Sequence, residues 1–152
     1  MGGDRATAED GAWLRGAYPK ITNSRIRERI ASAIGRMGGE ANNQWLMTLA
    51  KNQDEPLTAR MSALRRISQD MDIATIAKFY DSVSERPLRE TLIRNLADRK
   101  EPEAVDKLID IVKNSTDPDI RRTAISALAD KKDPRATKLL LDLVNNKPTS
   151  NE

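Results

Sequence analysis

Apolar residues recur along this chain at the spacing of one helix face, most clearly between residues 117 and 144. Two amphipathic segments follow one another there, and each begins with an Asp-Pro pair, at Asp117 and at Asp133. An aspartate can accept hydrogen bonds from the first amides of a helix, and proline suits the first helical position because its missing N–H would be unpaired there. The apolar positions are Ile120, Ala124, Ile125 and Leu128 in the first segment and Ala136, Leu139, Leu140 and Leu143 in the second. The stretch predicts two antiparallel helices.

A template built on one arginine repeats this pattern upstream. Arg27, Arg60, Arg89 and Arg121 stand seven residues before Ile34, Ile67, Leu96 and Leu128, and successive arginines are 33, 29 and 32 residues apart. Such a period is typical of helical-hairpin solenoids, in which each hairpin buries its apolar face against the next. We predict arginine-bearing helices over residues 24–36, 57–67, 86–98 and 118–130. Companion helices begin near residues 41, 72 and 102, and the last covers 134–145.

A second, longer interval of 62 residues separates Tyr18 from Tyr80 (18 to 80) and Leu46 from Leu108 (46 to 108). It predicts that a pair of hairpins was duplicated, and it makes the segment around Trp13 a further companion helix. All seven prolines fall at the edges of predicted helices. We therefore expect one helical-repeat domain over residues 12–146, with flexible polar tails at 1–11 and 147–152.

The stretch from Val112 to Val144 resembles the HEAT repeat, in particular the short bacterial type also seen in phycobilisome lyase-like proteins. In that family an A helix leads through an aspartate turn into a B helix that opens with an apolar-Arg pair and continues as Ala-x-x-Ala-Leu. The matching residues are Asp117, Ile120, Arg121, Ala124, Ala127 and Leu128, and Leu88-Arg89 and Ile26-Arg27 match in part. The second unit departs from the pattern, because Ala59 precedes Arg60 and Asp54 stands six residues before it.

The resemblance covers residues 12–146. It implies an all-α fold, a right-handed α-α superhelix (HEAT-like α-solenoid) of about four helical hairpins plus a terminal helix. In such a fold the arginine-bearing B helices line the concave side.

Two sets of arginines are candidate functional residues. Arg27, Arg60, Arg89 and Arg121 are interpreted as structural, binding turn carboxylates and carbonyls of their own or the next repeat. The alternative is an anion-binding ladder, which an arginine near the positive end of a helix dipole serves poorly.

The second set follows from the charge distribution, since the four B helices carry a net charge of +7 and the four complete A helices carry none. The candidate partner-binding residues lie off the apolar stripe and are Arg29, Arg65, Arg66, Arg94 and Arg122. An ordinary solvated helix face is the alternative interpretation.

Composition limits the chemistry. The 152 residues include no cysteine and no histidine, which removes thiolate chemistry, histidine metal sites and imidazole catalysis. No phosphate-binding glycine loop or nucleophile elbow occurs. Asp106 and Asp110 are interpreted as a solvated pair, and Trp13, Trp45, Phe79 and Tyr80 as packing residues. We expect no catalytic residue, metal or cofactor.

Function is predicted from the repeat architecture. The leading hypothesis is a non-catalytic scaffold that mediates protein–protein interaction through its concave B-helix surface. The alternative is a nucleic-acid-binding module that uses the B-helix arginines, since the chain is basic with a net charge of +3. The partner stays unidentified, and we expect a monomer or a weak dimer formed through exposed repeat ends. The compartment stays open between cytoplasm and periplasm, and no segment is predicted to cross a membrane.

Overall fold

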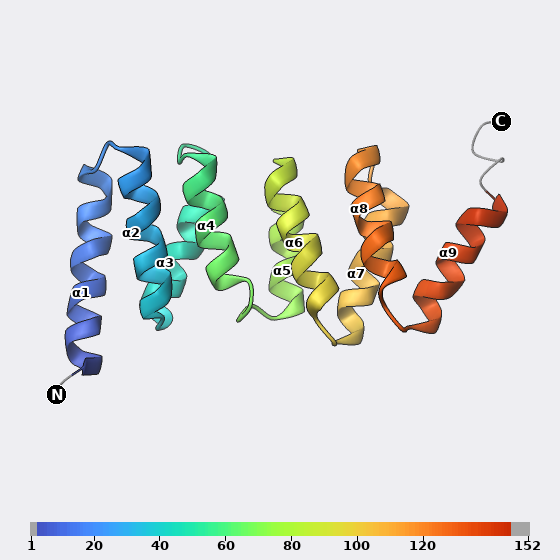
Figure 1. Cartoon of the computed structure of the whole chain (residues 1–152), viewed down its shortest axis with the longest axis horizontal. Coiled ribbons are helices and arrows are strands. Elements are labelled where there is room, and N and C mark those ends of the chain that lie inside the picture. Colours follow the sequence, from blue (N-terminus) through green and yellow to red (C-terminus); the bar gives the residue numbers. More distant parts are fainter. Residues whose placement is uncertain (1–2, 147–152) are drawn as a thin grey trace. The chain divides into compact units, whose positions relative to one another are not determined.

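The computed structural model describes the backbone of residues 3–146 and the side chains of residues 8–145. This part of the chain contains nine α-helices, one 3-10 helix and no strand (Figure 1). The elements are α1 (Gly3–Ala17), η1 (Tyr18–Lys20), α2 (Ser24–Met37), α3 (Glu40–Lys51), α4 (Leu57–Ile67), α5 (Ile73–Ser82), α6 (Arg86–Asp98), α7 (Pro102–Asn114), α8 (Pro118–Ala129) and α9 (Pro134–Asn146). Successive helices form hairpins, so the prediction of an all-α solenoid of helical hairpins is confirmed.

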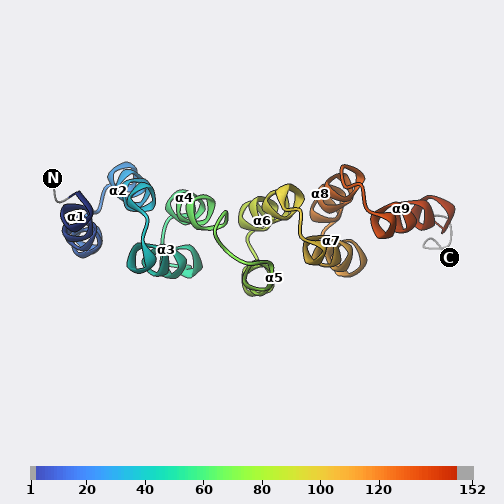
Figure 2. The same cartoon turned by 90° about the horizontal axis from the view of Figure 1, so that it is seen from below.

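The chain divides into two compact units between Asp70 and Met71. In the N-terminal unit, the B helices α2 and α4 pack side by side, and α3 packs against both (Figure 2). Helix α1 packs on α2 and α3. Two layers of helices therefore enclose the core of this unit.

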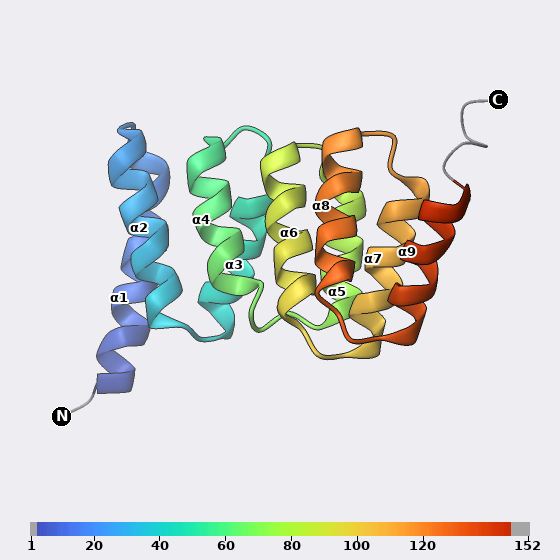
Figure 3. The same cartoon turned by 45° about the vertical axis from the view of Figure 1, so that its right-hand side comes forward.

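The C-terminal unit repeats this arrangement with one more helix. The B helices α6 and α8 form one layer, and α5 and α7 form the other (Figure 3). Helix α9 packs against α7 and α8. It is an A helix without a following B helix in the described residues.

The predicted apolar stripe lies in the core of each unit. Ile34 and Ile67 are buried in the N-terminal unit, and Leu96 and Leu128 are buried in the C-terminal unit. Burying one such side chain stabilises a fold by about 1.5–3 kcal/mol. The recurring aliphatic position of the template is thus the position that joins each B helix to its neighbours.

Helix starts follow the predicted capping chemistry. The Asp117 carboxylate accepts hydrogen bonds from the backbone amides of Asp119 (2.9 Å) and Ile120 (3.4 Å) at the start of α8. Asp133 accepts one from the amide of Arg135 (2.8 Å) at the start of α9. Each cap satisfies amides that have no partner inside the helix, which stabilises the helix by about 1 kcal/mol.

The turn between α2 and α3 depends on two glycines. Gly38 and Gly39 have φ of 71° and 91°, and no other described residue has a positive φ. Side chains rarely adopt this left-handed conformation, whereas glycine does so without a steric penalty. The pair therefore allows a sharp reversal that the other hairpins make with longer turns.

Two expectations at the N-terminus differ from the structure. Helix α1 begins at Gly3 and therefore includes most of the segment 1–11 expected to be a tail. The sequence of this segment does not predict a helix, because its residues lack an apolar period. Trp13 is 71% exposed, so its interpretation as a packing residue is wrong, since no described helix precedes α1 to cover it. The predicted tail at 147–152 lies outside the described residues, and the division into one domain and two tails stays a prediction.

Candidate partner-binding surface

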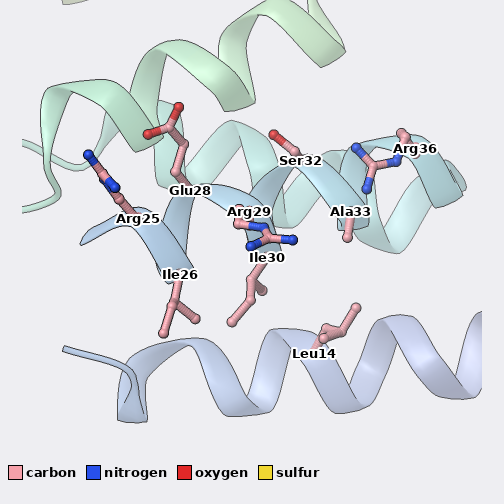
Figure 4. Close-up of a pocket in the computed structure, with 9 residues that line it drawn as sticks. All are labelled: Leu14, Arg25, Ile26, Glu28, Arg29, Ile30, Ser32, Ala33 and Arg36. Atoms are coloured by element: carbon pink, nitrogen blue, oxygen red, sulfur yellow. The ribbon is translucent and has the colours of Figure 1, made fainter. Parts of the chain in front are cut away.

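A groove of about 760 Å³ runs along α2 in the N-terminal unit (Figure 4). Ile26 and Ile30 point from α2 toward α1, and Leu14 points back toward them. Ile26 is 47% exposed, which is unusual for an isoleucine beside the core. The groove therefore offers an apolar floor to a second molecule.

Three arginines border this floor. Arg25, Arg29 and Arg36 line the groove and are exposed, and Glu28 is the one acidic residue among the lining side chains. Their spacing of four and seven residues places them on one face of α2, next to the apolar stripe. None of the three forms an ion pair with a side chain that the structure describes. The groove thus combines apolar contact with uncompensated positive charge.

The structure places the predicted partner-binding arginines as follows. Arg29 lines the groove, and Arg65 and Arg66 are exposed in the last turn of α4 in the same unit. Arg94 and Arg122 are exposed on α6 and α8 of the C-terminal unit. Arg122 forms an ion pair of 3.0 Å with Asp119. Sequence reasoning missed Arg25 and Arg36, although their helical spacing relative to Arg29 is a signal that could have found them.

Arg66 also has a packing role. A Cβ atom placed on Gly35 of α2 would lie only 2.5 Å from Cγ of Arg66. The aliphatic part of this side chain therefore covers α2 where the glycine leaves room, while its charged end stays exposed.

Arg27 belongs to the other set and is bound by its own unit. Its Nε donates a hydrogen bond to the carbonyl of Ile21, and its Nη1 lies 3.1 Å from the Glu55 carboxylate. Its guanidinium lies 4.8 Å from the centre of the Tyr18 ring, over the face that attracts a cation. Burial and a hydrogen bond to Glu55 raise the pKa of Tyr18 above its usual range.

The other three arginines of this set differ in their surroundings. Arg89 donates from Nε to the carbonyl of Val83 (2.7 Å), and Arg60 is 2% exposed and donates from Nε to Ala50 (3.0 Å). Arg60 reaches ten residues back because the turn before α4 is longer, as its departure from the repeat pattern suggests. Arg121 is exposed, and its side chain forms no hydrogen bond or ion pair with the described residues. These contacts support a structural role for three of the four, and that role stays a prediction.

The acidic side chains of the described residues do not gather into a metal site. Asp106 and Asp110 are exposed and bind different cations, Arg135 and Lys107. Among the residues that the structure describes, no group of three carboxylate, thiol or imidazole side chains could hold a metal ion. None of the described helices is both long enough and apolar enough to span a bilayer.

The family is decided by a comparison with family models, in which the model of HEAT repeats matches residues 73–151. This chain belongs to the HEAT repeat family. The match begins at the first residue of α5, so it covers the C-terminal unit of this HEAT-repeat chain. Comparisons with curated proteins and with solved structures give no match. HEAT repeats generally act as non-catalytic protein-interaction scaffolds, and the short bacterial, phycobilisome lyase-like subtype stays a prediction.

Proposed function

We propose that this HEAT-repeat chain is a non-catalytic scaffold that binds a protein partner through its concave B-helix surface. The groove between α1 and α2 receives an amphipathic segment of the partner that carries acidic residues. The observation that carries this proposal is the apolar floor of Leu14, Ile26 and Ile30 beside arginines that form no ion pair with the described side chains.

The chemistry of the groove favours a polypeptide. Apolar surface removed from water contributes about 25 cal/mol per Å², and an amphipathic helix supplies such surface along one face. Acidic side chains on its flank would meet Arg25, Arg29 and Arg36, which improves both specificity and the association rate. Arg65 and Arg66 extend the positive surface along α4 of the same unit.

A nucleic acid uses such a groove less well. Its phosphates gain from the arginines but not from the exposed apolar floor. Arg94 and Arg122 in the C-terminal unit remain candidates for contact with either kind of partner.

The experiment compares the native chain with charge-reversed variants. The immobilised chain is incubated with lysate of the source organism, and each protein it retains is produced alone and its Kd measured. We expect Arg25→Glu with Arg29→Glu to weaken binding at least tenfold. Arg121→Glu is the matched control, because Arg121 is exposed and its side chain forms no hydrogen bond or ion pair with described residues.

A parallel titration with duplex DNA separates the alternatives. Binding through phosphates would make the DNA affinity fall by about 0.9 log unit per log unit of salt for each phosphate contacted. If DNA binds in this way, and the Arg25 and Arg29 substitutions do not change the Kd of the retained proteins, the scaffold proposal is wrong and the nucleic-acid alternative is right. Retained proteins that respond to the groove variants but not to the control support the scaffold.

A further inference from the structure

A small hollow in the C-terminal unit has an unusual lining. Its volume is about 210 Å³, and it is formed by residues of α5, α6, α7 and the turn before α8. Tyr80 lines it and is only 5% exposed, yet its hydroxyl has no hydrogen-bond partner among the described residues. The ring is buried while the hydroxyl oxygen itself is accessible from the hollow, so it can donate a hydrogen bond to a bound group or to water there.

Arg89 lines the same hollow, and only one of its guanidinium nitrogens donates a hydrogen bond to a described residue. Its Nε bonds the carbonyl of Val83, and its guanidinium lies 4.7 Å from the centre of the Tyr80 ring. No described carboxylate forms an ion pair with Arg89.

The neighbouring carboxylates are bound by other cations. Asp81 and Asp110 pair with Lys107 at 2.8 and 3.1 Å. Asp117 pairs with Arg86 at 2.9 Å. Among the described residues, nothing therefore binds the two terminal nitrogens of Arg89 or accepts a hydrogen bond from the Tyr80 hydroxyl.

In the N-terminal unit, the equivalent tyrosine and arginine bind a carboxylate. Tyr18 and Arg27 are the counterparts of Tyr80 and Arg89 at the longer repeat interval, and the Arg27 guanidinium lies 4.8 Å from the centre of the Tyr18 ring. There Glu55 Oε1 accepts one hydrogen bond from the Tyr18 hydroxyl (2.8 Å) and one from Arg27 Nη1 (3.1 Å). The same pair of donors is thus satisfied by a single carboxylate.

The difference between the units lies in one side chain. Asp117 is the counterpart of Glu55 at the same interval, but its side chain is one methylene shorter. Its Oδ1 accepts from the first amides of α8, and its Oδ2 accepts from Arg86. Neither oxygen bonds Tyr80 or Arg89, which leaves a hollow where the N-terminal unit holds a carboxylate.

We propose that this hollow is a binding site for a carboxylate supplied by a partner, namely the side chain of a glutamate in a polypeptide. One carboxylate oxygen accepts hydrogen bonds from the Tyr80 hydroxyl and the Arg89 guanidinium, as Glu55 does in the N-terminal unit. The inference that the carboxylate belongs to a polypeptide rests on the proposed function, whereas the inference that the hollow binds a carboxylate does not.

The charges around the hollow favour a single negative charge. Arg86 also pairs with Asp119, which pairs in turn with Arg122, so the four cations Arg86, Arg89, Lys107 and Arg122 balance the four carboxylates Asp81, Asp110, Asp117 and Asp119 before any ligand binds. A doubly charged phosphate would face three aspartates, whereas a carboxylate adds one charge beside the cation that lacks a partner. The two converging donors, rather than net charge, define the ligand.

The test follows the Nε–Hε signals of Arg89 and Arg27 by NMR in the whole chain at pH 7 and constant ionic strength. Acetate probes the site itself. Two blocked peptides, acetyl-Ala-Glu-Ala-amide and its glutamine counterpart, probe the side chain, and acetyl-Ala-Gln-Ala with a free carboxylate probes a chain terminus. We expect acetate and the glutamate peptide to shift Arg89 and to leave Arg27 unchanged, because Glu55 fills the first site.

Two variants make the result decisive. Tyr80→Phe keeps the ring in the core and should weaken acetate binding at Arg89 about tenfold, as expected for losing one hydrogen bond to a charged group. Glu55→Ala opens the first site, so Arg27 should then respond to acetate as well.

The opposite outcomes are equally clear. The proposal is overturned if acetate does not shift the Arg89 signal in the native chain but does shift the Arg27 signal in Glu55→Ala. It is also overturned if the glutamine peptide shifts the Arg89 signal as much as the glutamate peptide does. A response to acetate or a chain terminus alone overturns the glutamate source. The proposed function is tested separately, by partner binding to the groove variants Arg25→Glu and Arg29→Glu, and its failure would leave the acetate result unaffected.

Discussion

The hydroxyl of Tyr18 donates a hydrogen bond of 2.8 Å to the carboxylate of Glu55, which lies 37 residues further along the chain. The contact joins η1, at the turn of the first hairpin, to the turn before α4 in the second hairpin. Arg27 binds the same carboxylate, so one side chain connects both turns through two donors.

Removing this carboxylate should weaken the N-terminal unit. Glu55→Ala leaves the Tyr18 hydroxyl and the Arg27 guanidinium without their acceptor, and we expect a loss of about 2–3 kcal/mol. Both tryptophans of the chain, Trp13 and Trp45, lie in this unit, so urea unfolding followed by tryptophan fluorescence measures its stability. Asp54→Ala, at the exposed neighbour of Glu55 in the same turn, is the control and should change the free energy of unfolding by less than about 0.5 kcal/mol.

The same contact predicts a loss of stability at high pH. Burial, the hydrogen bond to Glu55 and the charge of Glu55 raise the pKa of Tyr18 in the folded state, although Arg27 opposes the shift. The unfolded chain releases this proton near pH 10, whereas the folded chain keeps it. The stabilisation is therefore complete below about pH 10 and is lost as the pH rises further.

Tyr18→Phe isolates this effect. The tryptophan-detected free energy of unfolding should fall more slowly between pH 10 and 11 in this variant than in the native chain. Tyr80 lies in the other unit and is present in both proteins, so the difference between their slopes isolates Tyr18. Equal slopes in the two proteins would contradict the prediction.

The helices could be predicted from the sequence because their start signals are local. Asp117 and Asp133 mark the starts of α8 and α9, and the predicted B helices agree with the observed ones within one residue at each end. Burial of the recurring aliphatic position could be predicted as well, since its period matches a helix face.

The long-range contacts could not be predicted in the same way. Whether an arginine is buried depends on the length of the turn before it, and the sequence shows only that the turn before Arg60 is irregular. The exposure of Trp13 depends on which helices surround α1, which no local pattern records. The pairing of Tyr18 with Glu55 had one available signal, the longer repeat interval that relates them to Tyr80 and Asp117.

The repeated arginines should differ widely in their contribution to stability. Arg60 is 2% exposed and binds the carbonyl of Ala50, so Arg60→Ala removes both packing and a buried donor. We expect a loss of about 2–4 kcal/mol in the tryptophan-detected transition. Arg121 occupies the same position of the template but is exposed, and Arg121→Ala should cost less than about 0.5 kcal/mol by circular dichroism. Equal losses would show that the template position, rather than its surroundings, sets the role.

The contact between Gly35 and Arg66 gives a prediction whose sign is opposite to helix propensity. In an exposed helix interior, replacing glycine with alanine stabilises by about 0.5–1 kcal/mol. At Gly35 the added methyl would lie 2.5 Å from Cγ and 2.9 Å from Cβ of Arg66, so α2 and α4 must move apart. We expect Gly35→Ala to lower the tryptophan-detected free energy of unfolding by about 1–3 kcal/mol.

Two further variants separate overpacking from propensity. Gly16→Ala is the matched control, because a methyl there meets nothing within 4 Å, and it should be neutral or stabilising. In a chain that carries Gly35→Ala, Arg66→Ala removes the contacts with Cγ and Cδ but not with Cβ, so it should recover part of the loss. If Gly35→Ala stabilises as much as Gly16→Ala, then α2 and α4 do not approach each other at Arg66 as closely as the structure shows.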